Sequence, residues 1–392
     1  MKEGWEIKKL GDVCEVMNGG TPKTGVPENW DGSHLWITPA EMGKRLSPYV
    51  SNTERKLTDF GLRDSSARML PPKSVILSSR APIGYLVINT EPMATNQGCK
   101  GLIPRSQIHY KYLYYYLLSI VDLLNSLGTG ATFKELSGGK LKEVTIPLSA
   151  LSEQFRLVAI LDEAFDGIAT AKANADKNLK NARQLFESHL NSVFSQRGEG
   201  WVEKRLGDIA DVQSGGTPSI SQKTYWGGNI PWYSSGELNT IFTYKSERQI
   251  TEQGLNNSNA KLFKKGSLLI GMYDTAALKM SILDRDGAFN QAIAGVRLNK
   301  QVQMEFLLYA INALKPKLLL ERRGVRQKNL SLGKIKDIIL PLPNLAVQQS
   351  IVNHINTLAT KTKRLESIYQ KKIEALDALK KSILQKAFAG GL

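Results

Sequence analysis

The sequence is poor in the residues that build metal centres and disulfide frameworks. It has only two cysteines, Cys14 and Cys99, and four histidines in 392 residues. Two thiols are too few for a disulfide framework or a thiolate zinc site, and the histidines show no metal-ligand spacing. The sequence therefore predicts no metal centre and favours a reducing, cytoplasmic setting.

Long hydrophobic runs are also missing. No apolar stretch approaches the ~18 residues that a membrane-spanning helix needs, and the opening MKEGWEIKKLGD lacks the apolar core of a signal peptide. Apolar residues still make up 42% of the chain, which is enough to bury cores and excludes a disordered protein. At roughly 100–200 residues per domain, we expect two or three domains.

Sequence motifs of several enzyme classes do not occur. The chain has no GxxxxGKS/T phosphate loop, no GxGxxG after a strand, no GxSxG elbow and no Asn-Pro-Pro-aromatic strand end. Ser137 and Lys140, repeated as Ser331 and Lys334, have the Ser-x-x-Lys spacing of an acylating pair. Because the companion motifs of such enzymes are absent, we interpret both serines as turn residues before a strand. We expect no catalytic residue and no cofactor in this chain.

What the chain has in excess is positive charge. Lys and Arg number 52 against 36 Asp and Glu, which gives a formal net charge of +16. Such a surplus favours a polyanionic partner, either nucleic acid or an anionic membrane surface.

The chain contains two copies of one sequence. Residues 4–22, GWEIKKLGDVCEVMNGGTP, and 200–218, GWVEKRLGDIADVQSGGTP, are identical at eleven of nineteen positions. Each copy spans about 195 residues, which suits a domain with an appendage better than the unit of a solenoid. Three later positions recur at the same offset: Trp30 as Trp226, Trp36 as Trp232 and Glu41 as Glu237.

The first ~145 residues of each copy have the pattern of a mixed α/β domain, with short apolar runs between Gly and Pro. We expect a helix over 110–125, matched by one over 304–318. Its tyrosines, Tyr112, Tyr115 and Tyr116, are spaced like a nucleotide-stacking stripe, but we interpret them as core residues. The expected strands are 74–78, 86–89 and 144–147 in the first copy, and 267–271 and 338–341 in the second.

The rest of each copy predicts one long helix. Residues 151–194 contain no proline and one glycine, and apolar residues recur at steps of three and four. A helix of this length spans ~65 Å and needs a partner along its apolar seam, so we expect the two helices to pair antiparallel. The predicted seams are Val158, Leu161, Phe165, Ile168, Ala171, Ala175, Leu179, Ala182, Phe186, Leu190 and Val193, and Ile355, Leu358, Leu365, Tyr369, Leu376, Leu379 and Ile383.

These patterns predict an α+β fold with two mixed α/β domains, two long antiparallel paired helices and an internal pseudo-two-fold repeat. The expected domains are residues 1–148 and 199–342. The expected helical segments are a central one at 149–198 and a C-terminal one at 343–392.

Duplicated loops carry the residues with the chemistry to contact DNA. One is the Gly-Gly-Thr loop of each copy, and another precedes the last strand of each domain; between these frame positions the copies diverge, and Ser79 with Arg80 lies at about the level of Tyr273. Glycines allow close backbone approach, while Lys, Arg, Thr and Gln bond phosphates or base edges, although a structural turn explains the glycines equally well. The candidates are Gly20, Thr21, Lys23, Ser79, Arg80, Thr132, Lys134, Gly216, Thr217, Lys223, Tyr273, Arg323, Arg326 and Lys328.

The order of motifs resembles a known family. Each copy has a W-x₄-LGD opening, a GGTP loop, a closing strand that ends in Pro (VTIPLSALSEQ, IILPLPNLAVQQ) and a long helix. This order, repeated over essentially the whole chain, resembles the specificity subunit of type I restriction–modification systems. The second copy departs slightly, because Val347 stands where the first copy has Glu153.

The resemblance implies a division of labour among subunits. Each mixed α/β domain would be a target recognition domain that reads one half of a split double-stranded DNA sequence. The paired helices would set the gap and dock two methyltransferase subunits, which bring S-adenosylmethionine and flip an adenine. A restriction and translocation subunit joins such complexes, and the specificity chain itself carries no catalysis.

Two other classes of protein stay open. A stand-alone two-headed DNA-binding regulator or architectural protein would satisfy its helical seams internally. A nuclease or hydrolase would need clustered carboxylates or a nucleophile with a base, and neither constellation is evident. Apolar residues off the predicted seams favour the subunit, because they suggest further partners: Phe155, Ile160, Ala164 and Leu185, with Val352, Ile373 and Ala387 in part.

Overall fold

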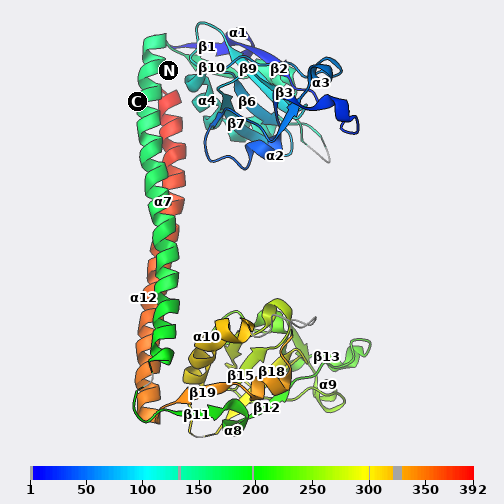
Figure 1. Cartoon of the computed structure of the whole chain (residues 1–392), viewed down its shortest axis with the longest axis vertical. Coiled ribbons are helices and arrows are strands. Elements are labelled where there is room, and N and C mark those ends of the chain that lie inside the picture. The colour runs from blue at the N-terminus through cyan, green and yellow to red at the C-terminus, as the bar shows by residue number, and fades with distance from the viewer. Residues whose placement is uncertain (1–2, 131–133, 197, 300, 321–328) are drawn as a thin grey trace. The chain divides into compact units, whose positions relative to one another are not determined.

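In the computed structural model, each copy of the repeated sequence folds around a sheet with a buried central strand. The structure describes residues 3–130, 134–196, 198–299, 301–320 and 329–392. Its contacts divide the chain into unit 1, Met1–Asp176 with Lys371–Leu392, and unit 2, Lys177–Gln370. Figure 1 traces the elements of both units.

Unit 1 has a main sheet of order β2-β9-β6-β7-β4, a small sheet of order β5-β3-β8 and the antiparallel pair β1-β10. All five residues of β6 are buried, as the central position requires. Its strands are β1 (Glu6–Lys9), β2 (Cys14–Asn18), β3 (Trp30–Ile37), β4 (Tyr49–Val50), β5 (Arg55–Leu57), β6 (Val75–Ser79), β7 (Ile83–Asn89), β8 (Met93–Thr95), β9 (Cys99–Pro104) and β10 (Thr145–Leu148). Its short helices are α1 (Leu10–Val13), η1 (Pro27–Asn29), α2 (Pro39–Met42), α3 (Asp59–Arg63), α4 (Tyr110–Ser119), α5 (Val121–Leu127) and α6 (Gly138–Glu143).

Unit 2 repeats this arrangement, with sheets of order β12-β18-β15-β16, β14-β13-β17 and β11-β19. The main sheet is again antiparallel between its inner strands. Its strands are β11 (Val202–Arg205), β12 (Ala210–Ser214), β13 (Trp226–Tyr233), β14 (Arg248–Ile250), β15 (Leu268–Gly271), β16 (Met280–Ile282), β17 (Ala288–Phe289), β18 (Ile293–Leu298) and β19 (Ile339–Leu342). Its short helices are α8 (Leu206–Ile209), η2 (Lys223–Tyr225), η3 (Ser235–Glu237), α9 (Glu252–Asn256), η4 (Asp274–Ala276), α10 (Met304–Leu320) and α11 (Leu332–Lys336).

The five expected strands correspond to β6, β7, β10, β15 and β19, and the helix expected over 304–318 is α10. The single helix expected over 110–125 is wrong, because the chain leaves helical geometry at Ile120 (φ −113°, ψ 17°) between α4 and α5. At this break Val121 packs closely against Gly84 of β7, because a Cβ on Gly84 would lie only 2.5 Å from Val121 Cγ1. Packing against the sheet therefore interrupts a segment whose sequence favours a continuous helix.

The tyrosines of α4 belong to the core, as predicted. Tyr112 is fully buried, and its hydroxyl donates to the Pro147 carbonyl at 2.6 Å. Tyr116 donates to the Thr145 carbonyl at 2.5 Å, so both side chains tie α4 to β10. Burial raises the pKa of Tyr112 well above its usual range, which keeps the phenol a hydrogen-bond donor.

The two long helices are α7 (Leu151–Ser195) and α12 (Leu345–Phe388). In unit 1 they run antiparallel, with Lys172 Nζ 2.7 Å from a carboxylate oxygen of Asp377. In unit 2 they also run antiparallel, with Arg183 Nε 3.5 Å from Glu366 Oε1. The predicted fold class, two mixed α/β domains with long paired helices, is confirmed.

The seam of α12 differs from the predicted one. Leu365 and Leu379 are 40% and 47% exposed, whereas Val352 and Ala387, placed off the seam by the sequence pattern, are buried. The prediction considered only apolar residues. The stripe of residues that is buried or half-buried in the structure continues at steps of three and four and includes polar residues. Its positions are Val352, Ile355, Ala359, Thr362, Glu366, Tyr369, Ile373, Leu376, Lys380, Leu384 and Ala387.

A buried glutamine fastens each long helix to its domain. Gln154 donates to the carbonyls of Gln107 (3.0 Å) and Ser149 (2.8 Å) and accepts from the His109 amide (2.8 Å). Gln348 does the same in unit 2, at 3.2, 2.8 and 2.9 Å. All of these partners are main-chain groups, so this glutamine contact depends on backbone shape, while side chains supply the rest of the attachment.

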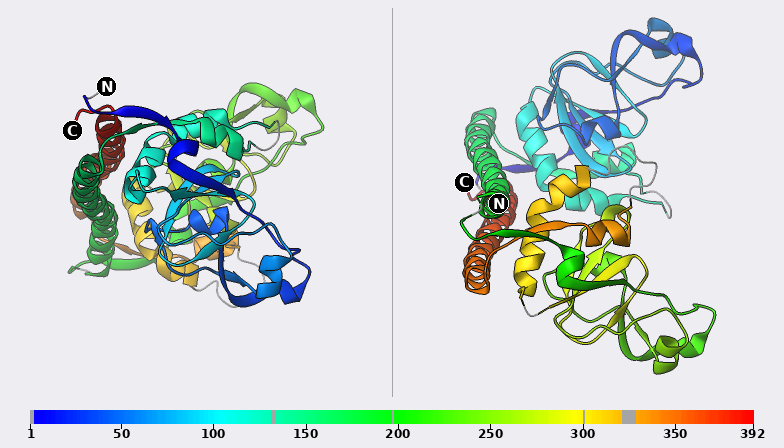
Figure 2. Two further views of the ribbon diagram at one scale, coloured as in Figure 1. Left: turned by 90° about the horizontal axis from the view of Figure 1, so that it is seen from above. Right: turned by 60° about the horizontal axis from the view of Figure 1, so that its bottom comes forward.

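The far end of each long helix completes the core of the unit that it enters. In unit 1 the Phe388 ring lies 5.2 Å from the rings of Tyr112 and Tyr116, and Leu384 is buried among them. In unit 2 Phe194, near the end of α7, lies 5.4 Å from Phe306 of α10. Figures 1 and 2 show α4 and α10 between the sheet of each unit and the long helices.

Replacing Leu384 by Ala should destabilise unit 1 by about 3 kcal/mol, because it opens a cavity in a closed core. Leu379→Ala, on the same helix at an exposed position, is the matched control and should change stability by less than ~0.5 kcal/mol. Equilibrium urea unfolding measures both. Equal effects of the two substitutions would contradict the packing described.

Candidate nucleic-acid interface

The Gly-Gly-Thr loops follow the first strand of each main sheet and are held by tryptophans. Trp36 Nε1 donates to the Gly20 carbonyl at 2.9 Å, and Trp232 Nε1 donates to the Gly216 carbonyl at 3.0 Å. A Cβ on either glycine would lie 2.2–2.3 Å from a neighbouring backbone atom. Both glycines are buried, so they serve the packing of the turn, and contact of these loops with DNA stays a prediction.

The threonines of these loops reach the turn that precedes β9 or β18. Asn96 Nδ2 donates to Thr21 Oγ1 at 2.9 Å, and Thr217 donates to Gln291 Oε1 at 2.5 Å. Both threonines are half-buried, while Lys23 and Lys223 further along are exposed. The Asn-Gln pair of this turn occurs in both copies of the sequence, but the sequence alone did not place it beside the Gly-Gly-Thr loop.

In unit 1 the same turn meets two further loops. The Ser79 amide donates to the Gly98 carbonyl at 2.8 Å, and the Leu136 amide donates to the Ser79 carbonyl at 2.9 Å. Ser79 is fully buried, and its hydroxyl has no hydrogen-bond partner in the described part of the chain. Ser79 joins the loops through its main chain, and a direct contact of this residue with DNA stays a prediction.

A cluster of charges lies where these loops of unit 1 meet. Arg80 Nη1 and Lys100 Nζ each lie 3.8 Å from a carboxylate oxygen of Glu135. Lys100 is almost wholly buried, whereas Arg80 is half-exposed and Lys134, beside Glu135, is exposed. Neither Lys100 nor Glu135 was predicted, because nothing in their local sequence marks a functional residue.

Unit 2 brings the corresponding loops together with different side chains. The Met272 amide donates to the Ala292 carbonyl (2.9 Å), and the Leu330 amide donates to the Met272 carbonyl (2.8 Å). The exposed Tyr273 takes the place of Arg80. An open hollow of about 710 Å³ beside the Gly-Gly-Thr loop is lined in part by Thr217, Lys261 and Gln291.

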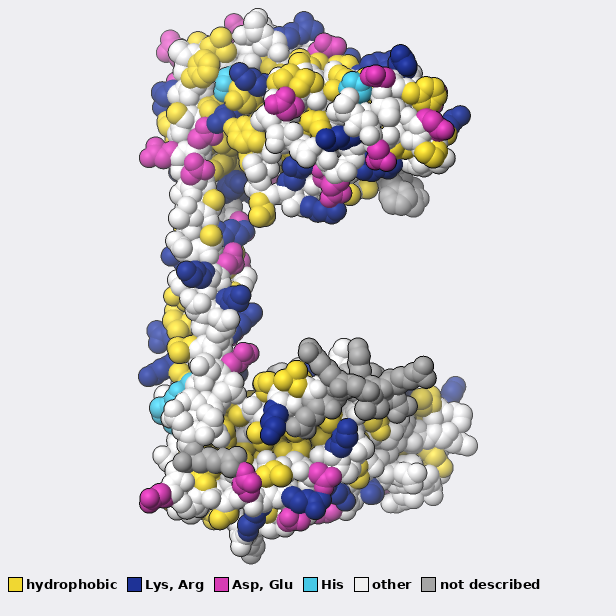
Figure 3. Space-filling model, in the orientation of Figure 1, with side chains coloured by type: hydrophobic (Ala, Val, Ile, Leu, Met, Phe, Trp, Pro, Cys, Tyr) yellow, Lys and Arg dark blue, Asp and Glu magenta, His cyan; other side chains and the backbone are white. Residues whose placement is uncertain are grey.

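The structure thus gathers Thr21, Ser79, Arg80 and Lys134 at one site in unit 1, and Thr217 and Tyr273 at its counterpart in unit 2. Four candidates, Thr132, Arg323, Arg326 and Lys328, lie outside the described residues. On the face drawn in Figure 3, described Lys and Arg side chains are interspersed with Asp and Glu, without one dominant basic patch.

The Ser-x-x-Lys pairs are helix caps. The Ser137 hydroxyl accepts from the Lys140 amide at 3.2 Å at the start of α6, and Ser331 does the same for Lys334 at the start of α11. Cys14 and Cys99 are buried, and burial raises the pKa of each thiol to about 12, which keeps both protonated. The described residues contain no group of three or more potential metal ligands.

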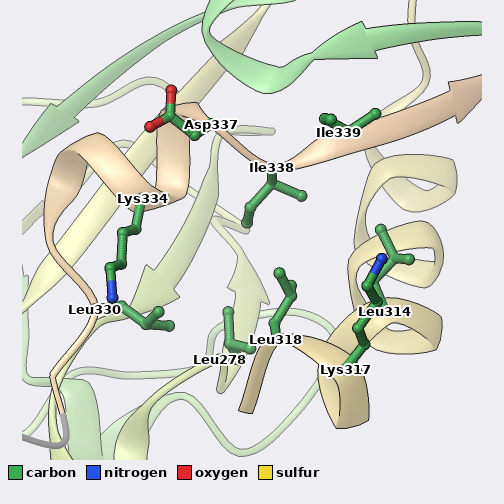
Figure 4. Close-up of a pocket in the computed structure, with 9 residues that line it drawn as sticks. All are labelled: Leu278, Leu314, Lys317, Leu318, Leu330, Lys334, Asp337, Ile338 and Ile339. Carbon is green, nitrogen blue, oxygen red and sulfur yellow. The ribbon is translucent and has the colours of Figure 1, made fainter. Parts of the chain in front are cut away.

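One hollow of unit 2 lies between α10, α11 and the start of β19 (Figure 4). Its walls are mainly aliphatic, and Lys334, the Ser-x-x-Lys lysine, contributes to them without its serine. Its described lining residues include none of the candidate contacts and no nucleophile paired with a base. Its lining residues are Leu278, Leu314, Lys317, Leu318, Leu330, Lys334, Asp337, Ile338 and Ile339.

The described helices include none with the length and apolar character needed to cross a bilayer.

Comparison with known proteins gives one consistent result. The model of the type I restriction modification DNA specificity domain matches residues 2–180 and 198–375, one match per copy. The type I restriction enzyme MjaIX specificity subunit of Methanocaldococcus jannaschii is 33% identical over 281 residues. That alignment covers 68% of this chain and 65% of the relative, so the chain spans less than two thirds of the relative's length.

Solved structures share the fold. One, from a study of complex assembly and conformational transition of the type I R-M system, has a TM-score of 0.83 at 19% identity and covers 100% of this chain and 99% of that one. The HsdS subunit from Thermoanaerobacter tengcongensis has a TM-score of 0.64 at 19% identity, covering 100% and 98%.

Replacing Gly20 by Ala should destabilise unit 1 by more than about 2 kcal/mol, because the new Cβ collides with backbone that has no room to move. Gly139→Ala is the matched control: its Cβ would have no neighbour closer than 4.0 Å, and the change should stay below about 1 kcal/mol. Thermal unfolding compares them, and an undisturbed Gly20→Ala protein would refute the packing role.

Proposed function

Because the chain belongs to the family of type I restriction modification DNA specificity proteins, we propose that it is the DNA-recognition subunit of a restriction–modification complex. Residues 1–148 and 199–342 act as two target recognition domains, and each reads one half of a bipartite site in double-stranded DNA. The segments 149–198 and 343–392 supply the helices that set the gap between the halves. The chain works in the cytoplasm and carries no catalytic group of its own.

The observation that supports this proposal most is a duplicated frame with diverged loops. The Gly-Gly-Thr turn and its tryptophan are the same in both units. At the meeting point of the loops, however, unit 1 has Arg80 with Glu135 and Lys100, and unit 2 has Tyr273. Side chains recognise bases by contacts to the base edges. Two domains that share one fold and read different half-sites therefore need different side chains in the loops that reach the bases.

The exposed apolar residues of the long helices support the docking of partner subunits. In unit 2, Leu185, Leu365 and Ile368 are 59%, 40% and 49% exposed, and in unit 1 Leu379 is 47% exposed. These side chains lie outside the seam, so they are available to another protein. Two methyltransferase subunits, which bring S-adenosylmethionine, dock on the helices, and restriction subunits join them.

Exchanging residues 1–148 for the first domain of another family member should change one half-site and leave the other unchanged. The exchange keeps the Gln154 contact, which involves main-chain groups only, and the new domain has to supply the side chains that pack on Phe388. Methylated positions are mapped by sequencing DNA from cells that express the chain with its methyltransferase subunit. Robust methylation by the purified chain alone would contradict the proposed function, and a change in both half-sites would contradict separate reading.

Inserting seven residues after Asn178 and after Lys372 should lengthen the gap between half-sites by about three base pairs. Seven residues keep the seam in phase and add ~10.5 Å, which is about three steps of ~3.4 Å along DNA. Five-residue insertions at the same places are the control, because they rotate the seam out of phase and should abolish methylation. A gap unchanged by the seven-residue insertions would show that the helices are not the spacer.

A further inference from the structure

Each unit presents an exposed arginine that lies on a pair of tryptophans. In unit 1 the rings of Trp30 and Trp36, both on β3, lie edge to face with centroids 5.1 Å apart. Arg55 is paired with Trp36 across the β3–β5 ladder. Its Cζ lies 3.5 Å from the Trp30 ring centroid and 5.9 Å from that of Trp36.

Unit 2 contains the same arrangement. Trp226 and Trp232 of β13 also lie edge to face at 5.1 Å. Arg248 is paired with Trp232 across the β13–β14 ladder, and its Cζ lies 4.2 Å from the Trp226 ring centroid. The chain therefore built this contact twice, on the corresponding strands of two domains.

The tryptophans connect the arginines to the Gly-Gly-Thr loops. Trp30 Nε1 donates to the carbonyl of Lys23 at 3.4 Å, and Trp226 Nε1 donates to that of Ser219 at 3.1 Å. The second tryptophan of each pair holds the glycine of the same loop. Each arginine thus lies on the same rigid support as the loop, and in unit 1 this support also carries the exposed Lys23.

The charge of these arginines is not neutralised within the protein. Both side chains are exposed, and no carboxylate in the described ranges lies within ion-pair distance of Arg55 or Arg248. Stacking occupies a face of the guanidinium and leaves the N–H groups at its edge available. A planar, pre-oriented edge of donors is well suited to the oxygens of a phosphate group.

We infer that Arg55 and Arg248 are matched phosphate anchors, which hold each recognition domain on the DNA backbone whatever the base sequence. The inference rests on the proposed function and extends it. Within the chain, the loop tips differ between the units, whereas the arginine over the first tryptophan is the same in both. Two half-sites differ in their bases and share only the sugar–phosphate backbone, so a duplicated exposed cation fits the shared part.

The test measures binding of the full-length chain, assembled with its methyltransferase subunits, to a duplex that carries the site and to a scrambled duplex. R55M and R248M keep aliphatic packing on the ring and remove the charge. Each should weaken binding to both duplexes about eightfold near 0.1 M salt. The reason is that the loss of one phosphate contact reduces the magnitude of the negative slope of log affinity against log salt by about 0.9. The double variant should lower the slope by about 1.8.

The matched control is R63M, which removes the same charge from an exposed arginine at the end of α3. It should leave the slope unchanged. R55K retains the charge without the planar fork and should retain most of the slope while losing part of the affinity. If the arginine only covers the ring, its replacement should lower the melting temperature and leave the slope of log affinity against log salt unchanged. That result would overturn the inference.

Two further outcomes are distinguishable. A loss confined to the duplex with the cognate site would mean that these arginines read bases, which also overturns the inference and leaves the proposed function intact. Failure of the wild-type complex to bind either duplex would overturn the proposed function itself.

Discussion

A helix of 45 residues with a continuous apolar stripe is unstable without a partner, and this requirement governs the construction of the chain. In each unit the partner comes from the other copy of the repeat: residues 371–392 in unit 1, and the stretch of α7 from residue 177 in unit 2. The pairing also closes the domain cores, because Leu384 and Leu190 are buried among side chains of the domains. Neither mixed α/β domain is therefore a complete folding unit on its own half of the sequence.

Duplication separates the residues that maintain the fold from those available for recognition. Buried glycines, tryptophans and glutamines recur at equivalent positions and bond to main-chain groups. Two equivalent glutamates also bond to main chain. Glu41 accepts from the Glu54 amide at 3.2 Å, and Glu237 accepts from the Glu247 amide at 2.9 Å. Contacts to main chain do not depend on neighbouring side chains, so the loop tips are free to change while stability is retained.

The sequence was informative where its pattern was periodic or repeated, and uninformative where tertiary packing decided. The repeat, five of the strands and both long helices followed from the sequence pattern, whereas strands β2, β9, β12 and β18 of the main sheets did not. The helix break at Ile120 did not, because it depends on Val121 meeting Gly84 of a distant strand. At the site, Arg80 was recognisable by type and position, but Lys100 joins it only through the fold, and the burial of Ser79 could not be seen in its local sequence.

The polar residues in the seam of α12 show what a spacer needs beyond stability. Lys380 lies 4.8 Å from the Phe165 ring in unit 1, and burial together with nearby Lys172 lowers its pKa. Asp377, which pairs with Lys172, acts in the opposite direction and raises the pKa of Lys380. An all-apolar seam would be more stable but would tolerate a shift by one heptad, whereas a half-buried charge has one register in which it is compensated. If the helices set a distance on DNA, as proposed, a heptad shift is an error of about three base pairs, and a fixed register then outweighs the stability that the half-buried charge removes.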